Sequence, residues 1–337
     1  MQFGTINKYI LFGGGDLLLK VALFLKEKNH EVCIVTSERH FNENLLLVDD
    51  NNFGEFLINN SLKHIISKNI SNDTSVKNLI SEDALGLSFG AAWVFKENFI
   101  NLFNGKLLNL HGSRLPQNRG GGGFSWRIMV GDKVGVSLIH QIFPGIDTGD
   151  IIGYENYLFS EKCRIPIDYS KESIFKYFDF MCLFFQRVES HEEFMCTGQP
   201  EYLSTYWPRL NTDIHGYINW SFNVKDIERF VCAFDDPYKG AITIYNDEEI
   251  RLKKVFSNNN DGSFHPFQSG IIYRKINKMI FVAVNNGSLI INEVLNNNGD
   301  NIISTMTVGD RFYTPQAKLE KALQYRATYT PRGLKEG

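Results

Sequence analysis

The chain lacks paired cysteines, a membrane-length apolar run and a strong excess of charge of either sign, and each absence excludes a class of protein. Its 337 residues include five cysteines, none in C-x-x-C spacing, so neither a zinc site nor a disulfide framework is predicted. No apolar run approaches the length of a membrane span, and no secretory leader is apparent. A formal charge of -3 argues against a chain-wide attraction to nucleic acid. We therefore expect a cytoplasmic protein with reduced thiols and no membrane or nucleic-acid partner.

Three consecutive glycines follow the first apolar segment, but they do not complete a dinucleotide-binding motif. Residues 8–12 predict a strand, residues 17–28 a helix and residues 31–36 a second strand, with the glycines at the first turn. Position 18 is Leu and no acid closes the second strand, so the G-x-G-x-x-G pattern is absent and a dinucleotide site is disfavoured. Gly14 and its neighbours form either a plain turn or a turn whose backbone N–H groups face a ligand phosphate.

Apolar strands and amphipathic helices alternate through the first two thirds of the chain. Further strands are expected at residues 64–67, 85–93, 107–111, 135–141 and 151–159. Helices are expected at residues 73–80, 96–102, 124–130 and 171–190. This alternation predicts an α/β fold with a Rossmann-like core, in which helices cover both faces of a mainly parallel sheet.

The composition of the chain changes near residue 205. The segment 206–209, Tyr-Trp-Pro-Arg, indicates a linker, and helices are expected at 224–234 and 315–326. Short β-type runs separated by Asn/Gly turns predict a small barrel or sandwich, with strands at 241–245, 250–256, 270–273, 279–284 and 288–295. We therefore divide the chain into a larger domain, 1–205, and a linker with a smaller mainly-β domain, 206–337.

The most informative polar residues stand at the end of the strand predicted over 107–111. Asn109 and His111 are two positions apart, so both side chains project from one face, at the carboxyl end where open α/β sheets bind ligands. Asp147 follows 36 positions later, in a glycine-containing loop. A histidine, an amide and a carboxylate form a sensible set for acyl transfer, as proton carrier, oxyanion donor and orienting charge. Each residue alone is weak evidence, because such His and Asp residues are more often structural. We expect His140 to be structural, or at most near the site.

The chain resembles the formyltransferases that use 10-formyltetrahydrofolate. Four segments carry the resemblance: Asn109-Leu110-His111, Ser113-Arg114-Leu115-Pro116, the glycine-rich loop from Arg119-Gly120, and Asp147-Thr148-Gly149. It continues in three less specific segments: Gly216-Tyr217-Ile218-Asn219-Trp220, Pro237-Tyr238-Lys239-Gly240-Ala241 and Gly309-Asp310-Arg311-Phe312. Asn219 stands where the family has an acid, and Lys239 where it has a proline, which puts any role of that carboxylate in doubt. The resemblance implies a formyltransferase core followed by an oligonucleotide-fold-like (OB-like) C-terminal domain.

The resemblance also implies the chemistry. The substrate's primary amine would attack the formyl carbon of 10-formyltetrahydrofolate, the formyl donor. His111 would take or relay the amine proton, Asn109 would hydrogen-bond the formyl oxygen, and Asp147 would keep His111 correctly charged and help position a proton-carrying water. No metal is needed. The pterin would lie between the end of the 85–93 strand and the 142–147 loop, held largely by backbone groups. The expected folate contacts are Phe89, Gly90, Ala92, Ile142 and Gly145.

Three classes of amine acceptor compete under this resemblance. Methionyl-tRNA would require basic surface for phosphates, whereas this chain is mildly acidic. The tRNA-directed members also usually have an apolar residue at the Arg114 position and a proline in the glycine loop, which spans residues 120–123 here. Glycinamide ribonucleotide enzymes are shorter and lack a second domain. The Trp126 position resembles enzymes that formylate nucleotide-linked amino sugars.

We therefore predict a sugar N-formyltransferase, a homodimer like many relatives, acting on a nucleotide-linked (dTDP-type) amino sugar for lipopolysaccharide O-antigen or another surface polysaccharide. Trp126 would pack near the sugar or merely anchor its loop; Gly14 and Arg114 would approach phosphates; aromatic residues of the linker and second domain would stack on the base. The expected acceptor contacts are Gly14, Arg114, Trp126, Tyr206 and Trp220. The alternatives are a methionyl-tRNA formyltransferase and a non-catalytic folate- or nucleotide-binding protein, and the complete set of Asn109, His111 and Asp147 argues against the latter.

Overall fold

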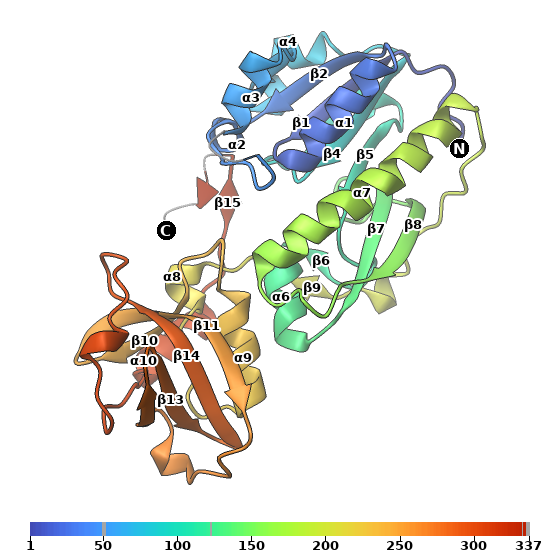
Figure 1. Cartoon of the computed structure of the whole chain (residues 1–337). Helices are drawn as coiled ribbons and strands as arrows, with labels where there is room; N and C mark the ends of the chain where they lie inside the picture. The colour runs from blue at the N-terminus through green and yellow to red at the C-terminus, as the bar shows by residue number, and fades with distance from the viewer. Residues whose placement is uncertain (49–51, 122, 332, 335–337) are drawn as a thin grey trace.

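The chain folds into two parts, each built around its own sheet (Figure 1). The computed structural model describes residues 1–48, 52–121, 123–331 and 333–334, so Gly122 of the glycine loop lies outside the described residues. The N-terminal part has a seven-stranded sheet and the C-terminal part a five-stranded one. No helix among these residues is long and apolar enough to cross a membrane.

The seven strands of the N-terminal sheet follow the order β3-β2-β1-β4-β5-β7-β8. Their bounds are β1 (Lys8–Gly13), β2 (Glu31–Thr36), β3 (His64–Ile66), β4 (Ala84–Phe89), β5 (Leu107–His111), β7 (Val134–Gln141) and β8 (Ile151–Leu158). The first five pair in parallel, whereas β7 and β8 are antiparallel additions at one edge. The predicted mainly parallel sheet is confirmed. β7 runs against the other six strands, and the short loop after it returns the chain directly into β8, which pairs with it in the antiparallel direction.

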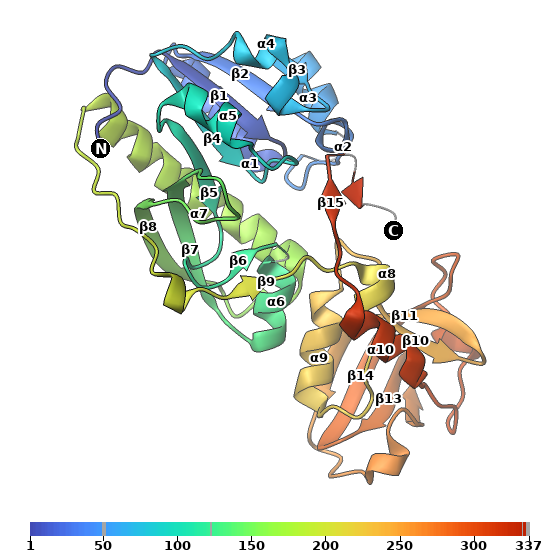
Figure 2. The same ribbon diagram turned by 180° about the vertical axis from the view of Figure 1, so that it is seen from behind.

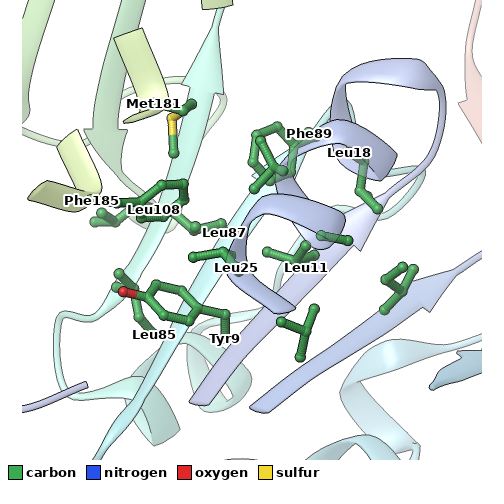
Figure 3. Packing of buried hydrophobic residues seen from close by; sticks show 14 of the residues in the cluster. Tyr9, Leu11, Leu18, Leu25, Leu85, Leu87, Phe89, Leu108, Met181 and Phe185 are labelled. Carbon is green, nitrogen blue, oxygen red and sulfur yellow. The ribbon is translucent and has the colours of Figure 1, made fainter. Parts of the chain in front are cut away.

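Helices cover both faces of this sheet (Figures 1 and 2). On one face lie α1 (Asp16–Glu27) and α7 (Pro166–Glu189); the other carries α4 (Thr74–Lys77), α5 (Glu97–Ile100) and the 3-10 turn η2 (Asn101–Phe103). Alternate strand residues divide between the two cores. On the α1 and α7 side, the buried cluster in Figure 3 includes Tyr9, Leu11, Leu87, Leu108 and Phe185.

The remaining helices of this part are short. They are α2 (Glu38–Phe41), α3 (Phe53–Asn59), α6 (Gly123–Val130) and the 3-10 turns η1 (Ile70–Asn72) and η3 (Glu201–Leu203). Strand β4 ends at Phe89, four residues before the predicted end, because Gly90 turns the backbone at a φ of +64°. The following residues therefore leave the sheet and stand over it.

The C-terminal part is a five-stranded antiparallel sheet with a helix packed on it, in the order β10-β11-β14-β13-β12. The strands are β10 (Ala241–Tyr245), β11 (Glu248–Asn258), β12 (Ile272–Ile276), β13 (Met279–Val284) and β14 (Gly287–Leu295). The helices are α8 (Thr212–His215), α9 (Val224–Ala233), α10 (Gln316–Gln324) and the 3-10 turns η4 (Pro266–Gln268) and η5 (Ile303–Thr305). The predicted smaller mainly-β unit is confirmed.

Two segments connect the parts in addition to the packing of α6 on α9. The first is the predicted linker, which is ordered: β9 (Tyr206–Trp207) pairs in parallel with β6 (Arg119–Gly120) of the glycine loop. The second follows α10 and returns to the N-terminal part, where β15 (Tyr329–Thr330) and β16 (Gly333–Leu334) form a small hairpin next to α2 (Figures 1 and 2). The hairpin of β15 and β16 therefore lies beside the N-terminal part.

Candidate active site

The structure brings Asn109, His111 and Asp147 to the wall of one cavity of about 610 Å³. Asn109 and His111 leave β5 on the face opposite Leu108, which packs in the core under α1 and α7. That alternation follows from the two-residue period of the strand. Asp147 comes from the β7–β8 loop and has a left-handed φ of 54°. This loop folds back over the catalytic face of β5.

The carboxylate of Asp147 is held by the glycine loop and directed at His111. Its Oδ2 accepts a hydrogen bond of 3.0 Å from the backbone N–H of Gly120, and its Oδ1 lies 3.8 Å from His111 Nδ1. Both side chains are largely shielded from solvent, with exposed fractions of 16% and 12%. His111 Nε2 is buried and has no hydrogen-bond partner among the described residues. The pair can therefore stabilise a charged imidazole while one ring nitrogen keeps its capacity to exchange a proton.

The backbone of the Asp147 loop is fastened by a residue that the sequence did not reveal. Gln199 Nε2 donates to the carbonyl oxygens of Asp147 (2.9 Å) and Gly149 (2.6 Å). Its Oε1 accepts from Nε and Nη2 of the buried Arg119, at 3.2 and 3.1 Å. Arg119 in turn pairs with Glu201 at 2.7 Å. No local motif marks Gln199, because its partners lie 50 to 80 residues earlier in the chain.

His140 belongs to the site, where the sequence had suggested a structural role or at most a place nearby. It stands opposite Asn109 in the β5–β7 ladder. Asn109 Nδ2 donates to His140 Nε2 at 3.1 Å, and His140 Nδ1 donates to the backbone oxygen of Gln141 at 2.7 Å. Burial, reinforced by the charge of His111, lowers the pKa of His140 to about 4. His140 is therefore neutral near pH 7, with its proton on Nδ1, and fixes the Asn109 amide.

Replacing His140 by leucine should lower kcat about tenfold while His111 and Asp147 stay in place. The leucine fills the buried space but removes the acceptor for Asn109 Nδ2, so the amide loses its fixed orientation; the loss of a hydrogen bond of this kind corresponds to about 1 kcal/mol. Steady-state kinetics with both substrates checks this. His140→Gln, which keeps an acceptor, should fall between the two. A kcat equal to wild type in His140→Leu would show that Asn109 is oriented by other contacts.

The cavity lining includes two unlike sets of residues, which we call its walls. One is mainly apolar and consists of residues 90–95 after β4 and residues 142, 143, 145 and 146 before Asp147. Such a wall can accept a flat ring, with backbone groups supplying hydrogen bonds. Four of the expected folate contacts, Gly90, Ala92, Ile142 and Gly145, lie on it. Phe89 instead points into the core under α1 (Figure 3).

The second wall consists of Gly120, Gly121, Tyr206, Arg209 and residues 326–328. Gly121 allows a close approach here, because a Cβ on it would lie 2.2 Å from Arg209 Cγ. A Cβ on Gly120 would likewise lie 2.5 Å from the carbonyl oxygen of Trp207. The glycine loop therefore makes room for the linker at the same point where it binds Asp147. Neither Arg209 nor Arg326 was expected at the site from the sequence.

Of the expected acceptor contacts, Tyr206 alone is among the described residues that line this cavity. Arg114 pairs with Asp132 at 3.1 Å, and Trp126 Nε1 donates to the carbonyl oxygen of Pro208 at 2.7 Å, which anchors the linker. Trp220 stacks on Phe312 in the C-terminal core and donates to Thr243 Oγ1. Gly14 packs against His40, where a Cβ would lie 2.7 Å from the imidazole's own Cβ. Trp126 thus anchors the linker, and Trp220 packs in the core of the C-terminal part.

The donor atoms of His111, His140 and Asp147 all lie within 4.8 Å of one another, a spacing that a metal ion could also bridge. His140 Nε2 already accepts the hydrogen bond from Asn109. Its other nitrogen donates to the chain's own backbone. Binding a metal would therefore require the site to give up the contact that orients Asn109.

Two buried neutral histidines should make the fold acid-sensitive. Burial is the main cause that lowers the pKa of both His40 and His140 to about 4. An unfolded histidine titrates near pH 6.5, so between about pH 6.5 and 4 the unfolded chain binds more protons than the native one, and stability falls as the pH is lowered. Urea unfolding at a series of pH values should show this fall from pH 7 to 5.

A pair of matched variants tests the origin of that acid sensitivity. His40→Asn should reduce the loss of unfolding free energy between pH 7 and 5. The same change at the exposed His191, whose φ of 53° suits asparagine, should leave the loss unaltered. Equal pH dependence in both variants would mean that His40 is not held neutral in the native state.

Family models match both parts of the chain. The model for the formyl transferase family matches residues 7–179, and the model for the formyl transferase C-terminal domain matches residues 212–306. Among curated proteins, the methionyl-tRNA formyltransferase of Rickettsia bellii is 24% identical over 246 residues, which cover 71% of this chain and 74% of that protein.

Two solved structures share the fold over almost their whole length. One is a sugar 3N-formyl transferase crystallised in the presence of dTDP and 5-N-formyl-THF, with a TM-score of 0.65 and 17% identity, covering 87% of this chain and 99% of that one. The other is the N-formyltransferase of Helicobacter canadensis in complex with folinic acid and dTDP-3-aminofucose, with a TM-score of 0.61 and 18% identity, covering 85% and 98%. At these identities the likeness concerns the fold.

Proposed function

The chain belongs to the formyl transferase family, and we propose that it transfers a formyl group from 10-formyltetrahydrofolate to the primary amine of a nucleotide-linked amino sugar. The observation that carries this proposal is the convergence of Asn109, His111 and Asp147 in a cavity with one apolar and one cationic wall. The apolar wall suits a pterin ring, and the cationic wall suits phosphates. The two structures of similar fold, with a folate and with dTDP or a dTDP-sugar, support the same pairing of substrates.

The formyl donor, 10-formyltetrahydrofolate, lies against the apolar wall. Gly90, Ala92, Ile142 and Gly145 line it, and their small or flat surfaces let the ring approach backbone N–H and C=O groups. The formyl group then reaches toward β5, where Asn109 and His111 face the cavity.

The transfer uses one hydrogen-bond donor, Asn109, and one proton carrier, His111. As the amine nitrogen bonds to the formyl carbon, electrons move onto the formyl oxygen, which accepts a hydrogen bond from Asn109 Nδ2. One Nδ2 hydrogen is held by His140, so the other is directed at the substrate. His111 takes the amine proton, and Asp147 stabilises the resulting imidazolium. The proton then passes to the folate nitrogen as its bond to the formyl carbon breaks.

The second wall of the cavity supports the proposed class of acceptor. Arg209 and Arg326 stand on that wall, whereas the chain as a whole is acidic, with a formal charge of -3. Two arginines on the lining of one cavity suit a small phosphorylated substrate better than the extended backbone of a tRNA. The sugar product would be of the kind that enters bacterial surface polysaccharides. Methionyl-tRNA is the second candidate, favoured by the sequence match to the Rickettsia bellii enzyme.

An acceptor panel tests the proposal. The protein is incubated with 10-formyltetrahydrofolate and dTDP-, UDP- and GDP-linked amino sugars, and the products are analysed by mass spectrometry for one added formyl group. A parallel reaction contains methionyl-tRNA, and His111→Asn serves as the background control. We expect turnover of at least one amino sugar. Turnover of methionyl-tRNA without any formylated sugar would replace our proposal by the second candidate, and no turnover of either would favour a binding protein.

A further inference from the structure

The C-terminal segment, residues 325–334, contributes to the lining of the cavity in the N-terminal part. After α10, the backbone oxygen of Tyr325 lies 2.9 Å from His215 Nε2, and His215 Nδ1 accepts from the backbone N–H of Asn211 at 2.7 Å. The second contact places the imidazole proton on Nε2, so His215 donates to Tyr325. From this anchor the chain crosses to the cavity, which residues 326–328 line, and continues to the hairpin beside α2 (Figure 2).

Arg326 is presented to the cavity mouth by an aromatic platform. Its guanidinium carbon lies 5.6 Å from the ring centroid of Tyr206, within the range of a cation–π contact. Tyr206 belongs to β9, which pairs with β6, the same strand that donates from Gly120 to Asp147. Arg326 is exposed, and among the described residues it makes no ion pair with a carboxylate. Its position is therefore tied to the catalytic loop, while its charge is available to a ligand.

A second cation stands on the same wall. The stem of Arg209 crosses Gly121, and its charge, after burial and the charge of Arg39, contributes to lowering the pKa of His40 to about 4. Arg209 therefore lies near His40, which packs on Gly14 at the start of α1, where the helix dipole adds partial positive charge. Asp147 is the one carboxylate among the described residues of the cavity lining, and the glycine loop engages it.

We propose that Arg326, together with Arg209, binds the diphosphate of the nucleotide-linked sugar, so that the C-terminal segment forms part of the acceptor site. This inference rests on the proposed function. Two guanidinium groups on one wall match the adjacent charged groups of a diphosphate, each of which can accept paired N–H donors. The glutamate carboxylates of the folate are the other available anions. The KM for the folate distinguishes them from the diphosphate.

Kinetics of Arg326→Gln tests this assignment. Loss of one charge-assisted contact should raise the KM for the amino sugar about tenfold or more, with kcat and the KM for 10-formyltetrahydrofolate within about twofold of wild type. Arg326→Lys should recover part of the loss. Lys321→Gln, which removes an exposed charge from α10 outside the cavity lining, is the matched control and should behave like wild type. A raised KM for the folate alone would assign Arg326 to the carboxylates and overturn the proposal, as would unchanged constants.

Equilibrium binding separates this inference from the proposed function. Titration calorimetry with dTDP and with inorganic diphosphate should show binding to wild type that weakens about tenfold in Arg326→Gln and persists in Lys321→Gln. Weakened binding together with an empty amino-sugar panel would retain the diphosphate site and reject the sugar substrate. Amino-sugar turnover with equal diphosphate binding in wild type and Arg326→Gln would retain the function and reject the site. Absence of diphosphate binding by wild type would also reject it.

Discussion

His111→Asn is expected to lower kcat by at least about 100-fold, because asparagine cannot carry the proton that the attacking amine must lose. The Nδ1 of His111 faces Asp147, and its Nε2 has no hydrogen-bond partner among the described residues. His140 has a pKa of about 4 and both of its nitrogens are hydrogen-bonded. It therefore cannot replace His111 near pH 7. Rates measured at saturating donor and acceptor isolate this effect from binding.

Two controls decide whether the lower kcat of His111→Asn reflects the loss of the proton carrier or a disturbed fold. The variant should unfold at the temperature of the wild type within a few degrees, since the side chain lacks hydrogen-bond partners on Nε2 whose loss would be costly. Added imidazole should recover some turnover if the cavity admits it, because a small base can then take the amine proton. A variant that keeps more than about a tenth of the wild-type kcat would remove His111 from the role of proton carrier.

The local periodicity of the chain was sufficient to predict most strands of the fold. Four of them, β2, β5, β10 and β13, have the bounds that were predicted. Such agreement is expected where a strand is buried and bounded by turn residues, since the signal lies within the strand itself. The pairing direction of β7 and β8, in contrast, could not be predicted from the local sequence. Pairing direction depends on where the connections lead the chain in space, which no local pattern records.

In the candidate site too, residues marked by a local pattern could be predicted, whereas residues that act through distant parts of the chain could not. Asn109 and His111 could be found because a two-residue spacing on a strand places them together. Asp147 was found by its spacing within a motif. His140 was underestimated, because its role depends on the residue opposite it in the neighbouring strand. Gln199 carried no signal at all, as it acts through backbone atoms of a distant loop.

The aromatic residues show where composition misleads. Trp126 was expected either to pack near the sugar, because its position resembles that of sugar-directed enzymes, or to anchor its loop, and Trp220 was expected to stack on the base. In the structure, both indole N–H groups are used within the protein, by Pro208 and by Thr243. A sequence shows that a tryptophan is present, but burial decides whether its face is available. Tyr206, which is 45% exposed, retains its face for Arg326 and the cavity.

The glycine loop links the catalytic and acceptor sides of the cavity. Gly120 has a φ of +103°, a conformation that most residues avoid, and this presents its N–H to Asp147. The same residue and Gly121 leave space for the linker and for Arg209. A side chain at either position would therefore displace the acceptor wall, and at Gly120 it would also release the carboxylate. This dual constraint accounts for the glycines at positions 120 and 121.

Asn109→Ala is expected to lower kcat by about 100- to 1000-fold, with little change in either KM. The amide is the side-chain donor on β5 that can meet the negative charge developing on the formyl oxygen, and the loss of one such donor has an effect of this size. Because the interaction strengthens only in the transition state, the loss should appear in kcat rather than in substrate binding. An effect confined to KM would indicate that Asn109 merely holds a substrate.

The double variant Asn109→Ala/His140→Leu provides the sharper test, because His140 reaches the substrate only through Asn109. The 3.1 Å hydrogen bond between them predicts strong non-additivity: once the amide is gone, removing its acceptor should lower kcat by less than about twofold, against about tenfold in the wild-type background. The measurement is a double-mutant cycle on kcat, with unfolding temperatures to confirm that all four proteins are folded. Independent, multiplicative losses would mean that His140 contacts the substrate or His111 directly, and that the orientation of the Asn109 amide is set elsewhere.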